Sequence, residues 1–160
     1  MSRLYVLCAE MMYWLSHLKS FFRTEGFFIS LIVFLVLAYF SPILFFGQVF
    51  FDEEQIGFYY PHSFFYSKAL REGTSLLWNN GYYAGVPVAF EQFVSAFFPV
   101  NRLLFGVLPF LAAHHWSIAF GVLAGCLAAY WFGREQSFSP LGSFVLSLSY
   151  LLATTFGWLS

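Results

Sequence analysis

Long apolar stretches separated by shorter polar ones dominate this chain. Residues 27–50 contain no Asp, Glu, Lys, Arg or His. At about 1.5 Å per residue, a helix of this length crosses a hydrocarbon core of about 30 Å. Two further apolar segments, 111–132 and 140–159, are also expected to span, the last being barely long enough. The pattern predicts an all-α membrane protein with about three transmembrane helices.

The residues before the first span follow a different pattern. In 1–25, apolar residues such as Leu4, Leu7, Met11 and Leu15 recur at helical spacing, with polar and charged residues between them. This is typical of an amphipathic helix that lies in the membrane interface. A cleaved signal peptide fits less well, because the apolar run that follows is long, begins late and has no small-residue cleavage site.

The stretch between the first two spans, 51–110, is long and rich in polar and aromatic residues. Pro61 suits the first turn of a helix and Gly73 its C-terminal cap, which predicts a short interfacial helix over 61–72. A second short helix is expected over 88–98, with Pro99 bringing it to an end. We therefore predict a large outer loop that carries short interfacial helices.

Composition narrows the class of protein further. The chain is 60% hydrophobic and only 9% charged, whereas a soluble domain has about 25% charged residues. Its net charge of −1 and the lack of a basic run exclude nucleic acid as a partner. Cys8 and Cys126 have no partners at metal-binding spacing, so neither a disulfide nor a structural zinc is expected.

Residues 1–160 are predicted to form a single membrane domain. Gly121, Gly125 and Ala128 give the second span a face on which another helix can pack closely. The sequence stops at Ser160 without a polar tail, and we expect it to be the N-terminal part of a larger polytopic domain. On that expectation the 160 residues alone have no enzymatic activity.

An acidic cluster follows the first span directly. If the chain after Phe51 is helical, Asp52, Gln55 and Tyr59 lie on one face, while Glu53 points about 100° away. Charged residues at a helix exit are commonly just solvated, and we interpret Glu53 and Glu54 in that way. Asp52 is therefore the candidate site residue of the cluster.

The order of residues along this loop resembles the N-terminal region of the YfhO-type bacterial membrane proteins. These belong to a superfamily of polytopic, GT-C-like glycosyltransferases that use lipid-phosphate-linked sugars. The residues that carry the resemblance are Asp52, Gln55, Tyr59, Pro61, Gly73, Leu77, Trp78, Asn79, Gly85, Val86, Pro87, Gln92, Phe98 and Pro99.

The resemblance implies a polyprenyl-phosphate sugar as donor, an acceptor at the outer face, and an acidic residue of the first outer loop at the catalytic centre. Asp52 stands at the matching position. The chemistry of the transfer agrees, because it needs a base for the acceptor hydroxyl and a cation to offset charge on the leaving phosphate. A carboxylate can act as that base, or it can hold Mg²⁺ or Mn²⁺ as the cofactor.

Other residues of the loop are candidates for substrate binding. They are Gln55, Tyr59, Trp78, Glu91, Gln92 and Arg102. Trp78 could stack on a sugar ring, although aromatic residues also collect at membrane interfaces. Arg102 could neutralise a donor phosphate. His114 and His115 lie at the edge of the second span, where a histidine needs no ligand, and we leave them out of the predicted site.

Other interpretations remain open. The chain could be a non-catalytic membrane assembly subunit that packs through its Gly and Ala face, or part of a transporter for a lipid-linked substrate. A transporter is expected to have polar or broken segments near the middle of its spans, whereas Pro42 is the one interruption of the first span. The expected partners are a lipid-linked sugar donor, membrane lipids and further transmembrane helices.

The first prediction concerns location and topology in the bacterial cytoplasmic membrane. Arg3, Lys19 and Arg23 precede the first span, and Arg134 follows the second. The positive-inside rule therefore places the start of the first span and the end of the second span in the cytoplasm. Residues 52–114 are then outside, and Ser160 is at or near the outer face. A membrane-impermeant maleimide should therefore label Ser75→Cys in intact cells. Labelling only after lysis would contradict this topology.

Overall fold

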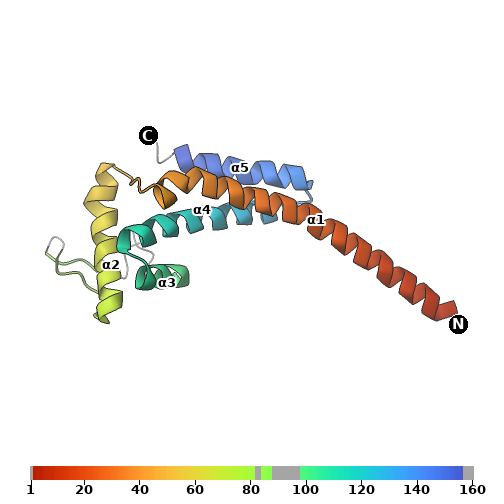
Figure 1. Ribbon diagram of the computed structural model, residues 1–160, viewed down its shortest axis with the longest axis horizontal. Coiled ribbons are helices and arrows are strands. Elements are labelled where there is room, and N and C mark those ends of the chain that lie inside the picture. Colours follow the sequence, from red (N-terminus) through yellow and green to blue (C-terminus); the bar gives the residue numbers. More distant parts are fainter. Residues whose placement is uncertain (1, 82–83, 88–97, 157–160) are drawn as a thin grey trace. The chain divides into compact units, whose positions relative to one another are not determined.

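The computed structural model describes residues 2–81, 84–87 and 98–156. The regular elements are helices (Figure 1): α1 Ser2–Phe45, the π-helix η1 Gln55–Tyr59, α2 Tyr60–Glu72, α3 Pro99–Val107, α4 Phe110–Glu135 and α5 Pro140–Phe156. Within the described residues the extended backbone makes no strand, only an isolated antiparallel bridge between Asn79 and Val86. The predicted all-α class is confirmed.

Two helical segments are long and apolar enough to cross a membrane. They are Thr24–Phe45, with 22 residues, and Phe110–Glu135, with 26. In their most apolar windows only 17% and 33% of the residues are buried, unlike the core helix of a soluble domain. At 17 residues, α5 is shorter and extends about 26 Å. Its crossing of the membrane stays a prediction.

The boundaries of the first helix differ from the sequence prediction. The predicted interfacial segment and the first span form one continuous helix, α1, from Ser2 to Phe45. This helix ends before residue 50, because Gly47 adopts a φ of 71° and the amides of Phe46 and Gln48 both donate to the carbonyl of Pro42. A left-handed glycine just beyond the last turn is a common helix terminator.

The region between the two membrane-length helices contains α2 nearly where it was predicted. Gly73, with a φ of 65°, caps α2 by donating its amide to the carbonyl of Ala69. Pro99 is the first residue of α3. Proline suits this first position since it has no amide hydrogen to leave unpaired. The helix predicted over 88–98 lies almost entirely outside the described residues.

The chain divides into two compact units, Met1–Ala38 with Val122–Ser160, and Tyr39–Gly121. In the first unit, α4 and α5 pack through small residues. A Cβ built on Gly133 would lie 2.8 Å from Ser143 Oγ, and one built on Gly125 would overlap the ring of Tyr150. Ser147 Oγ donates to the carbonyl of Cys126 at 2.8 Å. Gly125 on α4 therefore packs against Tyr150 on α5.

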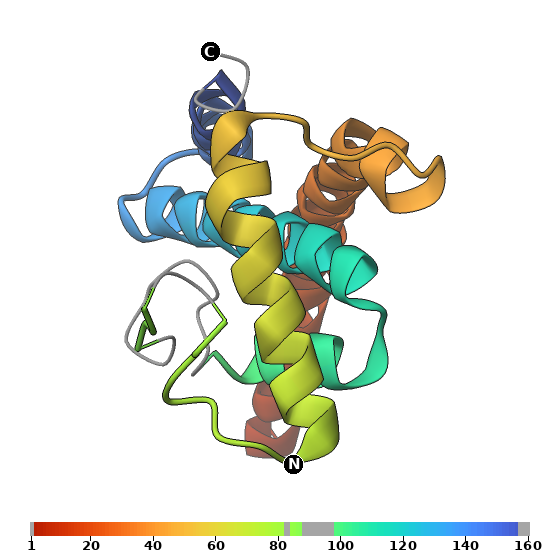
Figure 2. The ribbon, with the colours of Figure 1, turned by 90° about the vertical axis from the view of Figure 1, so that its left-hand side faces the viewer.

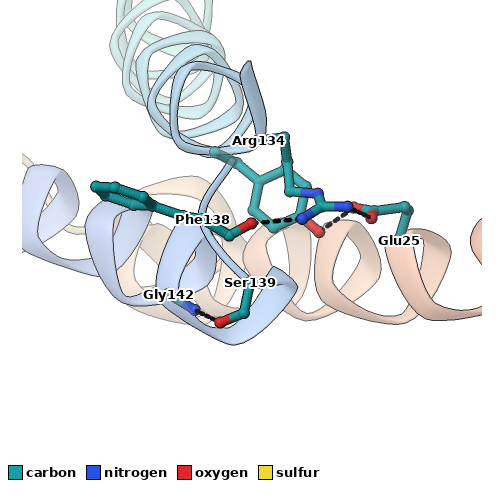
Figure 3. A network of polar contacts seen from close by, with 6 residues as sticks. Glu25, Arg134, Phe138, Ser139 and Gly142 are labelled. Carbon is teal, nitrogen blue, oxygen red and sulfur yellow. Dashed lines mark hydrogen bonds and ion pairs between the residues drawn. The ribbon is translucent and has the colours of Figure 1, made fainter. Parts of the chain in front are cut away.

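A buried ionic cluster ties α1 to α4 in the same unit (Figure 3). The carboxylate of Glu25, 2% exposed, accepts the Nη2 of Arg134 at 2.9 Å and also the hydroxyl of Tyr130. Arg134 Nη1 donates to the carbonyl of Phe138 at 2.5 Å, in the turn before α5. One guanidinium therefore joins α1, α4 and the turn that leads into α5.

The second unit has its own small core around α2 and α3. Tyr66, Leu104, Phe105 and Ala113 are buried together, and the rings of Tyr66 and Phe105 meet edge to face at 5.3 Å. Polar side chains support the packing, since Ser67 Oγ donates to the carbonyl of Phe105 at 3.2 Å. Figure 2 shows α2, coloured yellow to green, lying across α3 and the first turns of α4.

The ionic cluster generates a prediction about stability. Glu25→Ala should destabilise the protein by about 1–3 kcal/mol, because Arg134, whose side chain is 22% exposed, loses its carboxylate partner and the Tyr130 hydroxyl loses its acceptor. The double variant Glu25→Met with Arg134→Met should be less destabilised than either single variant, since no unpaired charge remains. Reversible unfolding in detergent measures both. Strictly additive effects would show that the ion pair does not couple the helices.

Two glycines of α4 provide a matched pair for a second stability prediction. Gly125→Val should destabilise by about 1–3 kcal/mol, because the new side chain meets the Tyr150 ring. Gly121→Val should have a much smaller effect, since a Cβ there has no atom within 4 Å. Thermal unfolding of both variants compares them directly. Equal losses would mean that the Gly125 contact does not stabilise the protein.

Candidate functional site

Asp52 stands at the start of a continuous helical segment that runs from residue 53 through η1 and α2. Its Oδ1 accepts the backbone amide of Gln55 at 2.7 Å, and its carbonyl accepts the amide of Ile56 at 3.1 Å. This is the bonding of a helix N-cap, in which a short acidic side chain satisfies an otherwise unpaired amide. The rest of the carboxylate is exposed, together with Glu53 and Glu54.

Gln55 points the opposite way, into the protein. Its side chain is fully buried, and Oε1 lies 3.0 Å from Nε2 of His114 on α4. The other ring nitrogen of His114, Nδ1, lies 2.9 Å from Oγ of Ser63 on α2. Ser63 and His114 are buried as well. Three side chains from η1, α2 and α4 thus form one buried hydrogen-bonded chain.

The π-helix η1 sets the orientation of Gln55 relative to α2. The amide of Tyr60 bonds the carbonyl of Gln55, five residues back, in place of the usual four. The predicted common face of Asp52, Gln55 and Tyr59 assumed a regular α-helix, and the structure instead separates an exposed Asp52 from a buried Gln55. Single π turns within helices are frequent at functional sites.

Two tyrosines border this cluster. The ring of Tyr59 lies 6.3 Å from that of His114, and burial raises the pKa of its phenol, with Glu54 and Asp52 adding to the effect. The hydroxyl of Tyr60 donates to the carbonyl of Phe50 at 2.9 Å. Burial also raises the pKa of Tyr60. Both phenols are therefore neutral near pH 7, and that of Tyr60 acts as a hydrogen-bond donor.

A cleft of about 600 Å³ lies along α2, between that helix and the loop that follows it. Pro61, Phe65, Lys68 and Asn80 are among the residues that line it. Pro61 follows Asp52 by nine positions on the same helical segment, or about 13 Å along its axis. The cleft combines apolar walls with amide groups and the opposite charges of Lys68 and Glu72, a lining that suits the hydroxyl groups of a sugar.

Trp78 forms part of the opposite wall of this cleft and is half exposed. Gly85, with a φ of 110°, packs so closely on the Trp78 indole that a Cβ there would overlap it. The bridge between Asn79 and Val86, with N–O distances of 2.8 and 3.0 Å, closes the loop behind the indole. The loop therefore holds one face of Trp78 and leaves the rest of the ring accessible.

The remaining predicted site residues are not gathered around Asp52. Arg102 is exposed on α3, where its charge lies near the Tyr66 hydroxyl. Glu91 and Gln92 lie outside the described residues. Among the residues that are described, no hydrogen bond or ion pair joins Asp52 to Trp78 or Arg102.

His114 and Ser63 were missed by the sequence prediction. A histidine pair within an apolar helix was a usable indication, because ionisable residues in such helices usually have a specific polar partner. Ser63 had no comparable signature, since one serine in a short helix is unremarkable in sequence. Only the packing of α2 on α4 identifies it as the partner of His114.

The donor set for the expected Mg²⁺ or Mn²⁺ is incomplete. Within the part of the chain that the structure describes, no three His, Cys, Asp or Glu side chains are close enough to hold a metal ion. Asp52 supplies a single carboxylate, and one of its oxygens already accepts the Gln55 amide. The described residues therefore do not fit a protein-held metal, and no catalytic step is derived through one.

Comparison with known proteins identified no relative of this chain. No family model, curated protein or solved structure matches the chain.

Proposed function

We propose that this chain belongs to an inner-membrane glycosyltransferase that moves a sugar from a polyprenyl-phosphate donor to an acceptor at the outer face. One observation carries the proposal: Asp52 presents an exposed carboxylate after the short connection, residues 46–51, that follows an apolar, membrane-length helix, in a turn anchored by the buried Gln55. The chain of a lipid-linked substrate lies in the bilayer, and its phosphate lies at the interface. A residue that follows a membrane-spanning helix is therefore in a suitable position to meet the reacting phosphate.

In the proposed reaction Asp52 is the general base. It takes the proton of the acceptor hydroxyl as that oxygen bonds to the anomeric carbon of the sugar, and the bond from that carbon to the lipid phosphate breaks. The electron pair of the broken bond leaves with the phosphate. One Asp52 oxygen is held by the Gln55 amide, which fixes the carboxylate while its other oxygen faces outward.

The cleft along α2 begins about 13 Å from Asp52 along the helical axis, and it supports a sugar site on the same helical segment. Trp78 offers an indole face for stacking on a sugar ring, and Lys68 offers a positive charge for a phosphate at the same cleft. Tyr59, Glu91, Gln92 and Arg102 are further candidates for contacts with substrate. In this proposal Arg102 meets the donor phosphate where α3 begins.

Asp52→Asn in the complete protein should reduce sugar transfer by two or more orders of magnitude. Asparagine still accepts a backbone amide as an N-cap, so the turn and the expression level should be retained. What is lost is the negative charge and the ability to take a proton. Transfer from a polyprenyl-phosphate sugar in isolated membranes measures the effect.

Glu54→Gln is the matched control, since it removes an exposed carboxylate two residues away that does not cap the turn. It should keep most of the activity. Normal turnover by Asp52→Asn would reject Asp52 as the base and would favour a non-catalytic assembly subunit or a transporter segment.

A further inference from the structure

We propose that His114 is a positioning residue that holds the Asp52 turn in place through Gln55. The proposal rests on the function assigned above to Asp52, and it gives a role to a buried histidine that the reaction itself does not use. The residues that carry it are His114, Gln55 and Ser63, which are 5%, 0% and 0% exposed.

The direction of each hydrogen bond in this chain follows from the chemistry of the groups. Oε1 of Gln55 can only accept, so Nε2 of His114 carries the hydrogen and donates to it at 3.0 Å. A neutral imidazole then has a bare Nδ1, which accepts the hydroxyl hydrogen of Ser63 at 2.9 Å. Ser63 thereby fixes both the tautomer and the orientation of the ring that holds Gln55.

Gln55 passes this constraint to Asp52 through its own backbone. Its side chain is bound to α4, while its amide donates to Asp52 Oδ1 at 2.7 Å. If the side chain of Gln55 loses its partner, a fully buried amide oxygen is left unpaired, which costs about 1–3 kcal/mol. The η1 turn can relieve that cost by rotating Gln55 outward, and such a rotation moves the amide that holds Asp52.

The π-helix gives this turn a hydrogen-bonding pattern that differs from that of α2. Its bond from Tyr60 to Gln55 spans five residues, a geometry that is rare in helices and is kept where the surroundings impose it. The His114 bond is such a constraint, because it draws Gln55 toward α4. Without it, the segment from residue 53 to α2 can return to ordinary α-helical bonding.

Two substitutions at position 114 distinguish the hydrogen bond made by Nε2 from the one made by Nδ1. His114→Gln can place an amide nitrogen where Nε2 was and keep the bond to Gln55, whereas His114→Asn can reach only the position of Nδ1 and keep the bond to Ser63. In lipid nanodiscs, His114→Asn should speed amide hydrogen exchange over residues 52–57 about tenfold. His114→Gln should stay close to the wild-type rate.

Gln55→Met provides an independent variant that removes the acceptor and conserves volume, and it should raise exchange in the same residues by a similar factor. Ser117→Ala is the matched control on α4. It removes the bond from Ser117 Oγ to Asn101 Oδ1, 2.7 Å long and three residues from His114, and should leave exchange over 52–57 unchanged.

Kinetics in the complete protein test the positioning role itself. His114→Asn should lower kcat for sugar transfer about tenfold to a hundredfold and leave KM nearly unchanged, because the base is displaced while the substrate cleft is intact. His114→Gln should restore most of kcat. A purely structural role would lower the amount of folded enzyme and leave kcat per folded molecule unchanged.

The proposal is overturned if His114→Asn and Gln55→Met exchange as slowly as wild type over 52–57, or if Ser117→Ala accelerates exchange there equally. It is also overturned if His114→Asn retains wild-type kcat. If exchange responds as expected but wild-type membranes transfer no sugar, the function proposed for Asp52 fails while the hold of His114 on the turn is supported.

Discussion

A polar side chain on an apolar helix needs a partner inside the protein, because hydrocarbon offers it none. Among the described residues, each compact unit contains a cluster that meets this need. Glu25 on α1 is matched by Arg134 and Tyr130 on α4, and His114 on α4 is matched by Gln55 and Ser63. Both clusters join helices that are distant in sequence, so satisfying the polar groups also decides which helices are neighbours.

Close packing between helices depends on a second constraint, the size of side chains at the contact. Gly133 meets Ser143, and Gly125 lies under the ring of Tyr150. Apolar side chains gain little from facing each other instead of lipid, so association relies on close approach and on hydrogen bonds such as that from Ser147 to the Cys126 carbonyl. Large apolar residues such as Phe34, Trp131 and Leu152 are left exposed, as suits contact with lipid or with further helices.

The same logic bears on the catalytic role proposed for the Asp52 turn. A carboxylate in a mobile loop would sample many positions, whereas Asp52 caps a helix whose first inward residue is tied to α4. Capping uses one carboxylate oxygen and leaves the other for solvent or substrate. The structural role of Asp52 as a cap and its proposed role as a base are therefore compatible, and the cap supplies the fixed geometry that a base requires.

The sequence by itself determined the helical class, the two membrane-length segments and the short helix between Pro61 and Gly73. These follow from local causes: runs of apolar residues, a proline suited to a first helical turn and a glycine suited to a left-handed cap. It also singled out Asp52 as the residue at the mouth of the first apolar helix. The start of α3 at Pro99 was not predicted, because a proline at a boundary can end one helix or begin the next, and its neighbours in sequence do not distinguish the two.

Only the tertiary structure decided which side chains meet. The bond between Gln55 and His114 spans 59 residues and that between Tyr130 and Glu25 spans 105. Neither pairing is encoded by spacing along the chain, because each depends on how two helices lie against each other. The burial of Gln55 beside an exposed Asp52 likewise depends on the π turn at η1, which periodicity of 3.6 residues does not anticipate. Local sequence therefore specifies the helices, while long-range hydrogen bonds between their buried polar groups specify the site.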